Sequence, residues 1–216
     1  MRRREEHTIH QIHQGLQRFQ TVVFPRMRSL YESLAEKQKP HTLFLTCGDS
    51  RIEPSLLTGT EPGQIFVERT PGNIVPIYDE TASVGVLASI EYAVAVLGVK
   101  HIIVCGHSAC GAMKALLDAN ALNELPATRR WLKYAHPALE QLNSASSFDS
   151  EPDRQTRLAQ LNVIEQMAHL HSHPAVQQRL TEDYLQIHGW FYEIHTGTVV
   201  VFDPDKSGFV HCPAAG

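Results

Sequence analysis

Two short apolar segments that each run into a cysteine or histidine place the strongest constraint on the fold of this chain. The first, His41–Thr46, ends at Cys47, and the second, with Ile102, Ile103 and Val104 at its centre, leads to His107 and Cys110. Apolar runs of this length are typical of strands that are covered on both faces. Both sets of polar side chains are therefore expected on turns that follow buried strands.

In an open parallel sheet, ligands collect in the crevice beyond the carboxyl ends of the strands. Two strand exits that carry Cys47, His107 and Cys110 can converge there, and two thiolates with one imidazole are a donor set for zinc. We therefore predict a Cys2His zinc site with a fourth position open to water, the form of a catalytic site. Cys105 lies within the apolar strand and is expected to pack as a small hydrophobic side chain instead of serving as a ligand.

The order of the other segments predicts an α/β protein. Gln64–Glu68 has the pattern of a strand, Thr81–Leu97 and Thr156–Leu170 those of helices, and right-handed crossovers between such elements build a parallel sheet. Leu185–Ile194 and Thr198–Phe202 are expected to form a hairpin at one edge of that sheet. The expected architecture is a central sheet flanked by helices.

Composition excludes several classes of protein. A chain of 216 residues with 43% hydrophobic content suits one globular domain. The formal charge of −4 offers no general attraction to nucleic acid or to an anionic membrane, and the most apolar segment, Val84–Val99, is shorter than the roughly 20 residues of a bilayer span. Four cysteines at uneven spacing do not suggest a secreted disulfide framework. We expect a soluble cytoplasmic protein, with no nucleic-acid or membrane partner.

We expect the first 37 residues to form an arm ahead of a core that spans residues 38–216, within a single domain. Residues 5–37 have the pattern of two helices broken at Pro25. Apolar side chains recur at three- and four-residue spacing along one side of this arm: Ile9, Ile12, Leu16, Phe19 and Val23. Such a stripe must be buried, either on the sheet of the same chain or on a second subunit.

Asp49 and Arg51 follow Cys47 closely enough to turn toward the same site. They could form an ion pair of little energetic value on a loop. Beside a metal, the carboxylate could instead accept the proton of a zinc-bound hydroxide, or occupy the fourth position itself and close the site. Bidentate pairing with Arg51 would keep Asp49 ionised and favours the open state.

The motifs Cys47-Gly48-Asp49-Ser50-Arg51 and Cys105-Gly106-His107-Ser108-Ala109-Cys110-Gly111 resemble those of the β-class carbonic anhydrases. The segments Arg69–Pro76, Ser89–Val94 and His188–Trp190 are also similar to that family, and the resemblance covers roughly residues 12–210. Ser108 and Ala109 resemble the open-site, type I-like subgroup.

The resemblance implies reversible hydration of carbon dioxide to bicarbonate and a proton, through zinc-bound hydroxide. It implies zinc ligation by Cys47, His107 and Cys110, with Asp49 orienting the hydroxide, or ligating as an alternative fourth ligand, and with Arg51 holding Asp49 off the metal. The remaining residues that it implies act on the substrate: Gln38 to position it, and Phe66, Tyr92 and Gly111 to line its pocket.

The family's architecture is four parallel strands with a fifth at the edge, assembled as dimers that often pair further. The resemblance therefore favours an N-terminal arm that packs on a partner subunit, and some pocket residues supplied by that partner.

This chain departs from the family pattern at three positions. Thr70 and Pro71 replace an asparagine and a small apolar residue, which leaves the shape of the pocket open, and Phe44 stands where the bicarbonate-regulated subgroup has a tryptophan. Two other functions are compatible with the same ligand set: a carbonyl sulfide or carbon disulfide hydrolase on the same zinc site, and a non-catalytic zinc-binding or redox-sensing protein.

Overall fold

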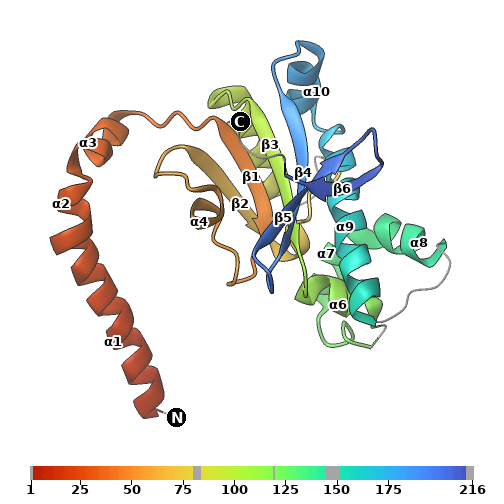
Figure 1. The fold of residues 1–216 in the computed structure, drawn as a ribbon, viewed down its shortest axis with the longest axis horizontal. Coiled ribbons are helices and arrows are strands. Elements are labelled where there is room, and N and C mark those ends of the chain that lie inside the picture. Colours follow the sequence, from red (N-terminus) through yellow and green to blue (C-terminus); the bar gives the residue numbers. More distant parts are fainter. Residues whose placement is uncertain (1, 80–83, 119, 145–150, 213–216) are drawn as a thin grey trace. The chain divides into compact units, whose positions relative to one another are not determined.

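The computed structural model describes residues 2–79, 84–118, 120–144 and 151–212, and its ribbon is drawn in Figure 1. The chain divides into two compact units, Met1–Gln38 and Lys39–Gly216. The expected helix over Thr81–Leu97 begins in a stretch that includes residues 81–83, which lie outside the described residues.

The first unit is helical. It consists of α1 (Arg2–Arg18), a π-helical turn (Phe19–Val23), α2 (Phe24–Arg26) and α3 (Arg28–Glu36). The helix was expected to break at Pro25, but the change of direction falls at Met27, where φ is −107° and ψ is 11°. Proline lacks an N–H, and the preceding π turn, in which Phe24 N–H donates to Phe19 O, carries the chain into the proline without a break.

The second unit is built on one six-stranded sheet in the order β2-β1-β3-β4-β5-β6. The pairs β1·β2, β1·β3 and β3·β4 are parallel, and β4·β5 and β5·β6 are antiparallel. The strand bounds are β1 Thr42–Cys47, β2 Ile65–Thr70, β3 His101–His107, β4 Gln186–Glu193, β5 Thr198–Asp203 and β6 Gly208–His211.

These pairings confirm the expected four-stranded parallel sheet with an added antiparallel edge. The expected hairpin is present, but its first strand, β4, is itself the fourth parallel strand, and the added edge consists of β5 and β6. The strand β6 was not predicted. Its four residues, Gly208–His211, are too few for a periodic pattern, and they pair only because the turn after β5 returns them to it.

The helix bounds are α4 Pro54–Thr58, α5 Val84–Glu91 with a π turn Tyr92–Val96, α6 Gly111–Leu117, α7 Pro126–Leu132, α8 His136–Ser144, α9 Glu151–Leu170 and α10 Pro174–Thr181. Figure 1 shows α6, α7, α8 and α9 together on one side of the sheet, α4 on the other side, and α10 at the opposite end from α6. The helix α10 was not predicted; Pro174 occupies its first position, where a missing N–H is tolerated.

One face of the sheet is covered by α9 and α5. Two glycines, Gly106 in β3 and Gly189 in β4, let α9 approach closely: a Cβ on Gly106 would lie 2.5 Å from Val163 Cγ2. Val163 is fully buried in the cluster that also contains Leu43, Val104 and Ile90 of α5. The spacing of α9 from the sheet therefore depends on the absence of side chains at these two positions.

The opposite face carries a smaller cluster, in which Phe44, Ile103 and Cys105 are buried against Leu57 of α4. A third cluster, at the carboxyl edge, joins α6, α8 and α9 and contains Cys47 and Cys110. Among the residues that the structure describes, no helix is both long enough and apolar enough to cross a bilayer.

Substituting Gly189 by alanine should destabilise the second unit. The new Cβ would lie 3.1 Å from both Phe202 Cβ and Val163 Cγ1 and would clash with Met167 Sδ. Overpacking of this kind typically costs about 1–3 kcal/mol, which urea unfolding would measure. Gly85→Ala is the matched control: within the described part of the chain, nothing lies within 4 Å of its Cβ position in α5, so stability should stay equal or rise by about 0.5–1 kcal/mol. Equal effects of both substitutions would contradict the close approach of α9.

Candidate metal centre

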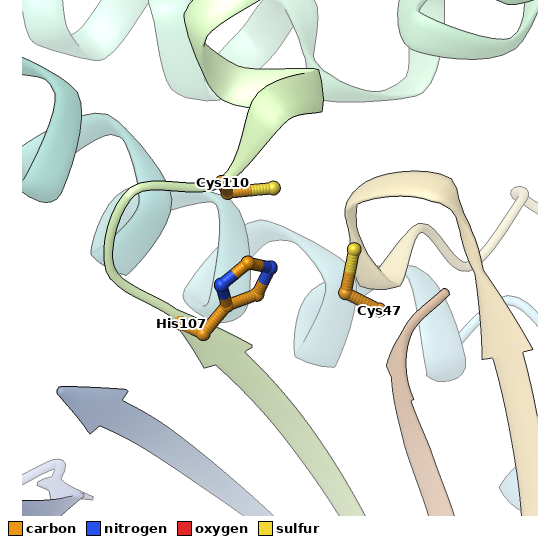
Figure 2. Close-up of side chains that lie close together, drawn as sticks. All are labelled: Cys47, His107 and Cys110. Atoms are coloured by element: carbon orange, nitrogen blue, oxygen red, sulfur yellow. The ribbon is translucent and has the colours of Figure 1, made fainter. Parts of the chain in front are cut away.

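Three potential metal ligands from separate parts of the chain meet at the carboxyl edge of the sheet. Cys47 is the last residue of β1, His107 is the last residue of β3, and Cys110 is the N-cap of α6. Their ligand atoms all lie within 4.8 Å of one another, and all three side chains are buried. Figure 2 shows both sulfurs and the imidazole directed toward a shared space between them.

The imidazole of His107 is held with one nitrogen toward this space. Its Nδ1 lies 2.8 Å from Ser108 O and donates a proton to that carbonyl, because a carbonyl can only accept. Its Nε2 is buried and has no hydrogen-bond partner among the described residues. A buried nitrogen lone pair without a donor is costly unless a cation binds it. The orientation and tautomer of His107 therefore fit a metal ligand.

Each of the two thiols affects the ionisation of the other. Hydrogen bonding from the Cys110 thiol, aided by His107 and the backbone, lowers the pKa of Cys47 to about 4, and the same contact with burial raises the pKa of Cys110. Gly72 N–H donates to Cys47 Sγ at 3.3 Å. The site thus already stabilises one thiolate, the form in which cysteine binds metals.

Gly72 was not recognised from the sequence as part of the site. It has a φ of 75°, a conformation that favours glycine, and its carbonyl accepts a hydrogen bond from Asn162 Nδ2 at 2.9 Å. The Pro71-Gly72 pair is a turn signal that could have indicated the conformation, but not the sulfur that the amide reaches.

The departures at Thr70 and Pro71 leave this loop well bonded. Thr70 Oγ1 donates to Ile74 O at 2.9 Å, and Pro71 O accepts a hydrogen bond from Trp131 Nε1 at 2.8 Å.

Asp49 and Arg51 form a bidentate pair beside the three ligands. Arg51 Nε donates to Oδ1 at 2.9 Å and Nη2 donates to Oδ2 at 2.7 Å, while the Arg51 backbone N–H also donates to Oδ1 at 3.0 Å. The Arg51 guanidinium holds the pKa of Asp49 well below its usual range. Oδ2 lies 4.0 Å from Nε2 of His107, so an ionised carboxylate borders the metal position.

Arg69 holds the loop that carries Asp49. Its Nε donates to Cys47 O at 3.2 Å, and its Nη2 donates at 2.7 Å to the carbonyls of Asp49 and Ile52. The side chain therefore spans the loop from the end of β1 to the start of α4. On the same sheet face, Phe44 packs edge-on against Trp190, with ring centroids 5.9 Å apart.

Of the residues predicted to line the substrate pocket, Gly111 lies next to a metal ligand, whereas Phe66 lies farther away within the same chain. Gly111 is the first residue of α6, next to Cys110. Phe66 and Tyr92 contact each other, with ring centroids 6.1 Å apart. However, Phe66 lies far from the metal ligands along β2. Thr70 is the register partner of Cys47, and Phe66 precedes Thr70 by four positions, which is about 13 Å along the strand. Gln38 ends the first unit, so its role stays a prediction.

The arrangement defines a class of protein: an α/β fold with a mostly parallel sheet and a group of three potential metal donors where the parallel strands end. Two sulfurs and one imidazole nitrogen suit a borderline-soft cation such as Zn²⁺, and three protein donors are the number found in catalytic zinc sites.

Comparison with known proteins extends this assignment. Residues 42–199 match the family model described as carbonic anhydrase. The chain is 47% identical to a carbonic anhydrase of Pseudomonas aeruginosa over 91% of its own length and 88% of the relative's. It is 42% identical to carbonic anhydrase 1 of Escherichia coli O157:H7, over 91% and 89% of the two chains.

Solved structures agree with the sequence relatives. The structure of the β-carbonic anhydrase CcaA superimposes with a TM-score of 0.91 at 38% identity, covering 95% of this chain and 100% of that one. A tetrameric β-carbonic anhydrase of Sordaria macrospora has a TM-score of 0.77 at 30% identity, covering 90% and 96%. The chain therefore belongs to the carbonic anhydrase family, in its β class.

Cys105→Ala should leave the metal centre intact, whereas Cys110→Ala should abolish it. The Cys105 side chain lies in the apolar cluster with Phe44 and Ile103, and burial raises its pKa to about 12, so it stays a neutral thiol. Metal content after reconstitution, measured by elemental analysis, should be one ion per chain for Cys105→Ala and close to none for Cys110→Ala. Loss of metal in both variants would contradict the assignment of ligands.

Proposed function

We propose that this chain is a zinc enzyme that interconverts carbon dioxide and bicarbonate, with the metal held by Cys47, His107 and Cys110. The observation that carries the proposal is the buried Cys-His-Cys group, with one imidazole nitrogen unsatisfied, in a chain of the carbonic anhydrase family. Bound there, zinc would lower the pKa of a water molecule toward neutrality and so supply the nucleophile for hydration.

In this proposal, Asp49 orients the attacking water. A carboxylate that remains ionised can accept a hydrogen bond and so fix the direction of the oxygen lone pair that reacts. Its Oδ2 lies at the border of the metal position, 4.0 Å from His107 Nε2. Because both oxygens of Asp49 already bind Arg51, a shift of the carboxylate onto the metal would disturb two charge-assisted hydrogen bonds. This favours the open site, with a solvent molecule as fourth ligand.

We further propose that the substrate pocket is shared between subunits. The Phe66–Tyr92 pair lies too far along the sheet to line the metal group of its own chain, and Tyr92 is 43% exposed. The exposed Tyr92 and its neighbour Phe66 are proposed to line the pocket of a second copy of the chain. Gly111 keeps open the space beside Cys110, since no atom of the described residues lies within 4 Å of its Cβ position. Gln38 is proposed to position the substrate.

The proposed assembly is a homodimer or a pair of dimers. The arm exposes large apolar side chains on its described part, among them Ile12 at 61% and Leu16 at 55% exposure. An apolar stripe of this kind is normally buried against another surface, here proposed to be the partner subunit. The proposed location is the cytoplasm, where reducing conditions keep thiolate ligands available; all four cysteines are free.

Hydration of carbon dioxide by the purified protein should be fast and metal-dependent. A chelator should abolish the activity, and Zn²⁺ should restore it, as followed by stopped-flow measurement of pH change.

Asp49→Asn removes the ionised carboxylate but changes the volume of the side chain little, so the variant should retain zinc while its kcat/KM falls by about 10²-fold or more. Sulfide release from carbonyl sulfide without hydration of carbon dioxide would contradict the proposed reaction.

Charges placed on the apolar stripe of the arm should break the assembly. Ile12→Glu combined with Leu16→Glu should shift the protein toward monomer in light scattering coupled to size-exclusion chromatography, because burial of two carboxylates in an apolar interface is unfavourable. The matched control is Gln11→Glu combined with Gln14→Glu, which adds the same charge at positions that are polar in the natural chain. An unchanged mass in the Ile12/Leu16 variant would contradict packing of the stripe on a partner.

A further inference from the structure

The turn that joins two of the proposed zinc ligands has an unfavourable backbone conformation. Between His107 and Cys110, Ala109 has a φ of 53°, in the left-handed region that residues with a Cβ seldom adopt. Such a conformation persists only where surrounding contacts impose it. The positions of both ligands therefore depend on whatever holds this turn.

Two side chains from other elements bind carbonyls on the Cys110 side of the turn. Arg51 Nη2 donates to Ala109 O at 3.1 Å, and Gln155 Nε2 donates to Cys110 O at 2.9 Å. Both hold carbonyls on the Cys110 side of the turn, and neither reaches the side of His107.

The His107 side of the turn is held by the end of β4. Ser108 is 6% exposed; its N–H donates to Tyr192 O at 3.0 Å, and its Oγ accepts from Ile194 N–H at 3.0 Å. The Ser108 hydroxyl then donates to Glu193 Oε1 at 2.6 Å, a short hydrogen bond to a charged acceptor. Tyr192 and Ile194 bind Ser108 through their backbone groups, whereas Glu193 binds it through its side chain. The Glu193 carboxylate therefore directs the Ser108 hydroxyl.

Ser108 in turn sets the orientation of His107, because its carbonyl accepts the proton of His107 Nδ1 at 2.8 Å. We propose that Glu193 is a positioning residue for the metal centre: by fixing Ser108 it holds the strained turn and directs Nε2 of His107 toward the metal. The inference rests on the proposed zinc function, and it assigns a role to a residue outside the family-like motifs. Partners of metal-binding histidines commonly contribute 10- to 100-fold to metal affinity.

Glu193 can be truncated without opening a void in the core. Its side chain lines a cavity of about 430 Å³ together with Arg51, Ala109, Gln155, Thr156 and His195, and His195 is exposed. Solvent can therefore fill the space left by Glu193→Ala, so the variant should fold.

The test compares Glu193→Ala, Glu193→Gln and Thr156→Ala in the full chain. The glutamine keeps an oxygen that can accept from Ser108, and Thr156 lines the same cavity from α9. Zinc affinity is measured by competition with a chromophoric chelator, and the geometry of the site by the absorption bands of the Co²⁺-substituted protein. We expect Glu193→Ala to weaken zinc binding at least tenfold and to shift the Co²⁺ bands, with Glu193→Gln within threefold of the natural chain and Thr156→Ala unchanged.

Relief of the backbone strain at Ala109 provides a second, independent test. Ala109→Gly removes the Cβ that disfavours a φ of 53°. If Glu193 acts through the strained turn, the loss caused by Glu193→Ala should shrink to less than threefold in the Ala109→Gly background.

An equal loss in both backgrounds, or unchanged affinity and Co²⁺ bands in Glu193→Ala, would overturn the inference. Failure of the proposed function is distinguishable, because the natural chain would then bind no zinc or bind it without hydrating carbon dioxide.

Discussion

The parallel pairing of β1 with β3 is the interaction on which the rest of the site depends. Thr46 lies opposite Cys105 in this register, so that Cys47 and His107 both emerge where their strands end. The pairing is strengthened there by a side chain, since Thr46 Oγ1 donates to Cys105 O at 2.9 Å in the buried interior. A shift of one residue would turn every side chain of β1 to the opposite face.

Backbone groups around the site are bonded by a few long side chains. Arg69 binds the carbonyls of the Cys47–Ile52 loop, Arg51 reaches from that loop to Ala109, and Asn162 and Gln155 of α9 bind Gly72 and Cys110. Buried loops would otherwise leave polar groups unpaired, which is costly. These hydrogen bonds keep the three candidate donors close enough to bind one cation, a geometry that a flexible loop would not maintain.

The two glycines under α9 link packing to function. Gly106 lies directly before His107, and Gly189 lies in the neighbouring strand, so the helix that supplies Gln155 and Asn162 to the site rests on the strands that supply and support His107. The close contact between α9 and the sheet thus positions the helix-borne amides relative to the ligands.

The sequence alone determined the α/β class, the three candidate ligands and the Asp49–Arg51 pair, because each depends on local patterns: apolar runs, their polar endings and a two-residue spacing. Only the tertiary structure decided which groups complete the site. Gly72 and Glu193 lie 25 and 85 residues from the positions that they contact, Cys47 and Ser108, and no periodicity encodes such a meeting. Likewise β6 and the passage of the chain through Pro25 follow from pairing and backbone hydrogen bonding, which depend on where neighbouring segments lie in space.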